Sequence, residues 1–183
     1  MSYSIIKTQL SEVLILEPKI YEDDRGFFFE SYHEKKFCQT VGLDIKFVQD
    51  NHSKSVRGVL RGLHYQIEHP QGKLIRVTQG AIFDVAVDIR KSSSSFGKWV
   101  GVELSEDNKR LLWVPAGFAH GFITISDTAH VLYKTTDYRY PEHERILIWS
   151  DPSLNIEWPV SSNLIIGKKD LEGKFLKDLD VFM

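Results

Sequence analysis

Apolar and polar residues alternate along the middle of the chain. Between Ala81 and Arg90 the odd-numbered residues from Phe83 onward are apolar, whereas Asp84 and Asp88 stand among the even-numbered ones. A period of two is typical of a β-strand, because successive side chains point to opposite faces of a sheet. Similar runs predict further strands at residues 74–78, 99–104, 111–114, 122–125, 131–135 and 146–149.

Gly, Pro, Asp, Asn and Ser separate these runs at the spacing of an all-β sandwich or barrel. One helix is predicted over residues 33–41, with Gly42 as its left-handed C-terminal cap, and a second, short helix begins near Lys169. Two such helices are too few to cover a parallel sheet. We predict an all-β, antiparallel jelly roll with a few short peripheral helices, although periodicity alone is compatible with other β-barrels.

Length and composition narrow the class of protein. A chain of 183 residues fits a single domain, 1–183, and an apolar content of 42% is that of a globular protein. The formal charge of -2 gives no reason to expect nucleic acid or an anionic membrane as a partner. No apolar run approaches the ~20 residues of a membrane span, and the first residues lack the features of a signal peptide. With Cys38 as the single cysteine, we expect a cytoplasmic protein.

Four segments combine charged residues, histidine and glycine beside predicted strands: 24–30, 49–53, 60–66 with 71–74, and 115–122. In the third, His64 lies near the start of a predicted strand and is a candidate base, because the unperturbed pKa of histidine is about 6.5. Lys73 is a candidate cation for a developing oxyanion. Taken singly, a structural histidine and a solvated lysine are the commoner interpretations.

Two further residues are candidates by position. Tyr133 falls on one face of the strand predicted at 131–135, so its hydroxyl could project into a barrel and donate a proton. A core tyrosine is the commoner case. Asp170 could orient a histidine, or be an ordinary acid at the start of a helix.

A metal site is the main alternative for this scaffold. Residues 115–122 contain the spacing Pro-x-Gly-x-x-His, which resembles the second metal motif of cupins. Metal-binding cupins usually carry His-x-His in their first motif, whereas this chain has His64-Tyr65-Gln66. Glu68 and His69 could serve as ligands, but a three-histidine set is absent from the sequence. We therefore expect a cupin-like scaffold without metal.

Arg25 and Arg61 each adjoin a glycine, where a guanidinium could bind a diphosphate in bidentate geometry. Together the segments resemble the dTDP-4-dehydrorhamnose 3,5-epimerase family, from residues 13–18 to about Asp170. The most specific matches, in the family's order, are 24–30 (Asp-Arg-Gly-Phe-Phe-Phe-Glu), 47–53 (Phe-Val-Gln-Asp-Asn-His-Ser), 60–64 (Leu-Arg-Gly-Leu-His), 71–74 (Gln-Gly-Lys-Leu), 117–122 (Gly-Phe-Ala-His-Gly-Phe) and 132–134 (Leu-Tyr-Lys).

The resemblance implies a cupin-like homodimer without cofactor, acting on a dTDP-linked 4-keto-6-deoxyhexose that it inverts at carbons 3 and 5. It implies that His64 is the base, oriented by Asp170, that Tyr133 donates a proton on the opposite face, and that Lys73 lies beside the 4-keto oxygen. Substrate contacts are implied for Arg25, Phe27, Glu30, Gln49, Asn51, Arg61, His120, Tyr138, Glu144 and Lys169, with Tyr138 against the nucleotide base.

These residue types suit the chemistry. A C–H bond beside a ketone is acidic because its carbanion delocalises as an enolate, so inversion needs a base, an acid and a cation near the carbonyl oxygen. No G-x-G-x-x-G follows a predicted strand, in keeping with a reaction that transfers no hydride.

One position departs from the family: Arg139 follows Tyr138, where many members have a second aromatic residue. The alternatives are an epimerase that inverts one carbon or a ketoisomerase on the same scaffold, a metal-dependent cupin such as a dioxygenase, and a jelly roll that binds carbohydrate without catalysis. The position of Tyr133 favours the two-carbon epimerase.

Overall fold

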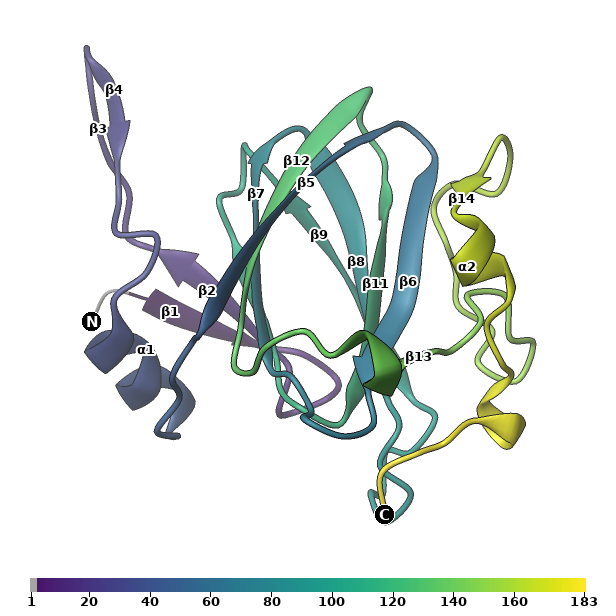
Figure 1. Ribbon diagram of the computed structural model, residues 1–183. Helices are drawn as coiled ribbons and strands as arrows, with labels where there is room; N and C mark the ends of the chain where they lie inside the picture. The colour runs from purple at the N-terminus through teal and green to yellow at the C-terminus, as the bar shows by residue number, and fades with distance from the viewer. Residues whose placement is uncertain (1–2) are drawn as a thin grey trace.

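The computed structural model describes residues 3–183 and places two β-sheets face to face (Figure 1). The first sheet has the strand order β1 (Tyr3–Lys7), β2 (Leu14–Pro18), β10 (Leu111–Val114), β7 (Lys73–Gln79), β12 (Thr128–Thr135) and β5 (Gln49–Val56). The second has the order β13 (Glu144–Ile146), β6 (Val59–Gln66), β11 (Phe118–Thr124), β8 (Ala81–Asp88) and β9 (Trp99–Ser105). All neighbours along these two orders are antiparallel, which confirms the all-β, jelly-roll prediction.

Smaller elements surround the two sheets. β3 (Tyr21–Asp23) and β4 (Gly26–Phe28) form a hairpin that projects away from the body, at the upper left of Figure 1. β14 (Ile165–Ile166) pairs in parallel with β6. The helical elements are α1 (Glu34–Val41), η1 (Pro141–His143), α2 (Lys168–Leu171) and η2 (Leu176–Asp178). In residues 3–183 no helix is long and apolar enough to cross a membrane.

Apolar side chains fill three layers. Between the sheets, Ile75, Ile82 and Phe122 belong to the central cluster. On the outside of the first sheet, α1 buries Phe37 against a cluster that includes Trp113. On the outside of the second sheet, the C-terminal segment covers a cluster that includes Val85. Both sheets therefore bury apolar residues on two faces.

In β8 the apolar face predicted from the alternation of apolar and polar residues points outward, away from the space between the sheets. Its apolar odd-numbered residues Val85 and Val87 face outward into the cluster covered by the C-terminal segment. Ile82 and Ala86 face the interior. Asp84, between them in the alternation, is completely buried, which places a carboxyl group among the residues between the sheets.

Both predicted helices are confirmed. His33 is the N-cap of α1 and Gly42 adopts a left-handed conformation, φ 74°, with its N–H donating to the carbonyl of Cys38. Glycine suits this position because it has no Cβ to clash there. The second helix, α2, begins at Lys168, beside the predicted Lys169.

Several strand boundaries differ from the predictions. The run predicted at 122–125 starts earlier and forms Phe118–Thr124. The strand predicted at 146–149 is wrong beyond Ile146, where β13 ends. Leu147 still exchanges both backbone hydrogen bonds with Leu63, but the chain turns at residues 149–150. His64 lies not near the start of its strand but sixth in β6.

Candidate active site

Two glycines allow β6 and β11 to approach closely. A Cβ on Gly62 would lie 2.7 Å from the Cα of Gly121, and one on Gly121 would lie 2.4 Å from the carbonyl oxygen of Arg61. Gly62 also has φ 109°, a conformation that side chains disfavour. This crossing makes His64 of β6 the register partner of His120 of β11. The Gly-x-His and His-Gly segments in the sequence therefore form one side of a site.

A cavity of about 180 Å³ opens between the two sheets at this point. The second sheet contributes His64, Arg61, Gln66, His120 and Glu144, and the first contributes Tyr133 and Lys73. Eight of the predicted site residues line the cavity: Gln49, Asn51, Arg61, His64, Lys73, His120, Tyr133 and Glu144.

His64 is held by a carboxylate from α2. Its Nε2 lies 2.6 Å from Oδ1 of Asp170, and the other carboxylate oxygen accepts the N–H of Gly62 at 3.2 Å. Burial raises the pKa of Asp170, but the hydrogen bond and charge of His64 and the N–H of Gly62 outweigh it, so the pKa lies below its ordinary value. An ionised carboxylate only accepts hydrogen bonds, so Nε2 carries the hydrogen and Nδ1 keeps the lone pair that can accept a proton.

A second histidine–carboxylate pair, which sequence reasoning missed in part, lies beside the first. His120 Nε2 is 2.8 and 3.0 Å from the two carboxylate oxygens of Asp84. Burial lowers the pKa of His120, while Asp84 raises it and Lys73 and His64 lower it further. His120 was predicted as a contact, but Asp84 was not; the available signal was a charged residue between apolar residues of a predicted strand.

Lys73 is buried in the wall of the cavity and donates to the carbonyl oxygen of His64 at 3.2 Å. Burial lowers its pKa to about 8, against the opposing charges of Asp84 and Glu144. A lysine that is still cationic at neutral pH and poorly solvated is well suited to stabilise an oxyanion.

On the sheet opposite His64, Tyr133 carries the phenol expected of a proton donor. Burial raises its pKa, while Arg61 and Arg139 lower it and Glu144 raises it. Glu144 accepts hydrogen bonds from Arg139, at 2.9 and 3.0 Å, and from Lys169. These two cations outweigh burial and lower the pKa of Glu144 to about 2. Lys169 therefore reaches the site through Glu144.

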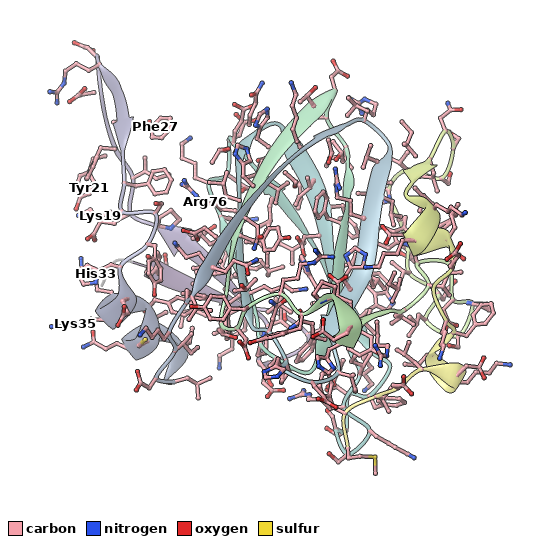
Figure 2. The ribbon with its side chains drawn as sticks, in the orientation of Figure 1. Lys19, Tyr21, Phe27, His33, Lys35 and Arg76 are labelled. Carbon is pink, nitrogen blue, oxygen red and sulfur yellow. The ribbon has the colours of Figure 1, made fainter. Side chains whose placement is uncertain are left out.

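Five predicted contacts lie outside this cavity: Lys169, which reaches it only through Glu144, and the four residues Arg25, Phe27, Glu30 and Tyr138. Phe27 belongs to the β3–β4 hairpin (Figure 2). Arg25 lies in the turn of the same hairpin, and Glu30 follows it in the chain. Arg25 is paired with Asp23 in that hairpin, and its side chain is 90% exposed. Tyr138, also highly exposed, lies on the segment that leads from β12 towards Glu144. Within one chain, Arg25, Phe27 and Glu30 do not line the cavity.

Among residues 3–183 no three His, Cys, Asp or Glu side chains are grouped to hold a metal ion. Metal independence and the lack of a cofactor stay predictions.

The fold is a cupin-like jelly roll, and the cavity between its two sheets is lined by titratable side chains. A sequence profile of dTDP-4-dehydrorhamnose 3,5-epimerase matches residues 7–178. The dTDP-4-dehydrorhamnose 3,5-epimerase of Pseudomonas aeruginosa is 55% identical over 173 residues, 94% of this chain and 96% of the relative. The chain belongs to the dTDP-4-dehydrorhamnose 3,5-epimerase family, as the resemblance implied.

Solved structures of epimerases have the same fold as this chain. A 3,5-epimerase of Legionella pneumophila in complex with dTDP-4-keto-L-rhamnose superposes with a TM-score of 0.95 at 51% identity, covering 97% of this chain and 95% of that one. A 3'-monoepimerase of Streptomyces bikiniensis in complex with dTDP-quinovose has a TM-score of 0.87 at 31% identity, covering 93% and 87%. One- and two-carbon epimerases thus share this fold.

Proposed function

We propose that the protein epimerises dTDP-4-dehydro-6-deoxy-D-glucose at carbons 3 and 5 to dTDP-4-dehydro-L-rhamnose. The observation that carries the proposal is the placement of His64 and Tyr133 on opposite sheets of one cavity, with the buried cation of Lys73 in its wall. The high identity to named 3,5-epimerases favours this substrate and two inversions over one.

In the first half of each inversion, Nδ1 of His64 removes the proton from the carbon beside the ketone. The electron pair of the broken C–H bond moves into the carbonyl group and forms an enolate, whose oxygen the ammonium group of Lys73 stabilises. Asp170 stabilises the imidazolium that His64 becomes.

In the second half, the hydroxyl of Tyr133 donates a proton to the same carbon from the other face. The enolate electrons return to form the new C–H bond, and the phenolate regains a proton from solvent while His64 loses one. The ketone is restored, no atom is lost and the carbon is inverted. Repetition at the other neighbour of the ketone completes the reaction.

For the substrate contacts, we propose that Arg61, at the cavity, binds the diphosphate and that Gln49, Asn51 and His120 contact the sugar. We further propose a homodimer in which Arg25, Phe27 and Glu30 reach the cavity of a second copy. The exposed aromatic rings of Phe27 and Tyr21 on the projecting hairpin support this arrangement (Figure 2). Light scattering of the purified protein tests the homodimer, for which the expected mass is twice that of one chain.

The deciding experiment is proton NMR of the protein with dTDP-4-keto-6-deoxyglucose in heavy water without added metal. Loss of the signals at carbons 3 and 5, with formation of the L-sugar, is the expected result. Exchange at one carbon would favour the one-carbon epimerase, and no exchange would overturn the proposal.

Tyr133→Phe separates the two halves of the reaction. Without the phenol, His64 still removes the proton and returns deuterium from the same face, because its side chain is 37% exposed and can exchange with solvent. We expect deuterium incorporation with retention and little L-sugar. Equal loss of incorporation and inversion would contradict the assigned roles.

A further inference from the structure

Residues 137–140, here called the strap, connect β12 to η1 and cross from the first sheet to the second without belonging to a strand or helix. Backbone groups in such a segment need other partners. Three glutamine side chains supply them. Gln71 Nε2 donates to the carbonyls of Asp137 and Tyr138 at 2.9 and 3.1 Å, and Gln49 Oε1 accepts the N–H of Arg139 at 3.2 Å.

Gln66 makes the most complete set of these contacts. Its Oε1 accepts the N–H of Tyr140 at 2.7 Å, and its Nε2 donates to the carbonyls of Tyr138 and His69 at 3.1 and 2.8 Å. The residue is only 3% exposed, so these groups have little access to water as a replacement. A neutral amide is required, because a carboxylate cannot donate to the two carbonyls.

The strap carries Arg139 to the cavity. Its guanidinium forms the bidentate pair with Glu144, and both side chains line the same cavity as Tyr133. Arg139 is 56% exposed at the side chain, so its own contacts with the protein do little to fix it. The backbone of the strap must provide that restraint.

We propose that Gln66 is a positioning residue for the reaction: its amide fixes the strap so that Arg139 stays paired with Glu144 in the cavity that Tyr133 also lines. Gln71 supports the same segment from the rim. The inference rests on the proposed function for its catalytic part, because it assigns Arg139 to the proton donor.

Movement of the strap should affect the second half of the reaction, in which Tyr133 donates a proton. When Tyr133 gives up its proton it becomes a phenolate, and a nearby guanidinium stabilises that anion. Arg139 already opposes the effect of burial on the pKa of Tyr133. If the strap moves, proton donation slows, while proton removal by His64 on the other sheet continues. A general loss of folding would instead lower both.

Gln66→Leu tests this, since leucine fills similar space but satisfies none of the three backbone groups. In heavy water we expect the rate of inversion to fall about tenfold, while the rate of deuterium incorporation stays near that of the wild type. The incorporated deuterium should then be found mostly with retained configuration. The matched control is Gln79→Leu, an exposed glutamine at the end of β7, which should leave both rates unchanged.

A double-mutant cycle shows whether Gln66 acts through Arg139. Arg139→Ala alone should slow inversion, and adding Gln66→Leu should slow it no further. Wild-type inversion in Gln66→Leu, equal loss of inversion and incorporation, or effects that multiply would each overturn the proposal. If Gln66→Leu does not fold, Gln71→Leu at the rim takes its place with the same expected outcomes.

Limited proteolysis, which does not depend on catalysis, distinguishes a failure of the proposal for Gln66 from a failure of the proposed function. Trypsin cuts after arginine, and the Arg139–Tyr140 bond lies in the strap. We expect Gln66→Leu to accelerate native-state cleavage at that bond, and Gln79→Leu not to; unchanged cleavage would show that Gln66 does not hold the strap. Wild-type protein without deuterium incorporation would overturn the proposed function and the catalytic role of Gln66 with it, whereas the cleavage result concerns the strap alone.

Discussion

The site has two histidine–carboxylate pairs, whose histidines are register partners on β6 and β11, but the two pairs differ in burial. The side chains of His64 and Asp170 are 37% and 10% exposed, whereas those of His120 and Asp84 are 8% and 0% exposed. The residue types and the nitrogen–oxygen distances are similar.

The difference indicates distinct roles for the two pairs. A base must take a proton from substrate and release it to solvent, which the half-exposed His64 can do. His120 pays a desolvation penalty for becoming charged, and burial lowers its pKa accordingly. We therefore expect His120 to remain a neutral hydrogen-bonding residue, with Asp84 orienting it. The pairing of histidine with carboxylate alone does not identify a base.

The largest expected effect is that of His64→Asn, which should reduce deuterium incorporation into the substrate by about 10²–10⁴-fold, the contribution of a general base. His120→Asn is the matched variant and should cost about tenfold, because it removes a polar contact and not the base. NMR exchange rates in heavy water measure both. Equal losses, or near-native exchange in the His64 variant, would end the distinction between the pairs.

Asp170→Asn should have the next largest effect, about 10²-fold on exchange. The amide no longer stabilises the imidazolium, and its NH₂ group can force the wrong tautomer on His64. A crystal structure of the variant with an unchanged His64 ring would show that the loss is electronic. Exchange within twofold of wild type would mean that Asp170 only supports the fold of α2.

The pH dependence distinguishes the cation from both pairs. The pKa of Lys73 is lowered to about 8 in the folded protein from an ordinary 10.5, so exchange should fall up to tenfold per pH unit above about pH 8. Between these two values the unfolded chain binds more protons, so the contribution of Lys73 to stability rises with pH as activity falls. In Lys73→Met the free energy of unfolding should no longer rise with pH between these two values, which urea unfolding at a series of pH values measures. A flat rate up to pH 10 would contradict the assignment.

The smallest effect on catalysis is expected for Asp84→Asn, whose cost should appear in stability. Loss of a charged acceptor at a fully buried site should destabilise the fold by about 1–3 kcal/mol, measured by urea unfolding, while exchange falls less than tenfold. A loss of exchange as deep as that of His64→Asn, with stability intact, would instead place Asp84 in the chemistry.

Much of the site was predictable because its residues lie in short segments of distinctive chemistry. His64, Lys73, Tyr133 and His120 were identified from such segments and meet at one cavity. The contact between His64 and Asp170, 106 positions apart, came only from resemblance to a family. No local pattern predicts a pair at that separation.

Other features were hidden for a physical reason. β5 and β6 line the cavity, so their inward faces carry polar side chains such as Asn51 and Arg61, and the apolar alternation that predicts a strand is weak or absent. For β8 the alternation was evident, but which face points inward depends on the C-terminal segment that covers Val85. Asp84 was therefore missed.

The sequence by itself determined the strand-rich class, the helix cap at Gly42 and the residue types needed for acid–base chemistry, because local periodicity, backbone conformation and side-chain pKa are properties of short segments. Only the tertiary structure decided which histidine is exposed, which strand face encloses the cavity and that the hairpin of Arg25 lies away from it. Burial and long-range pairing depend on how distant segments pack, and they decide which titratable group can transfer a proton.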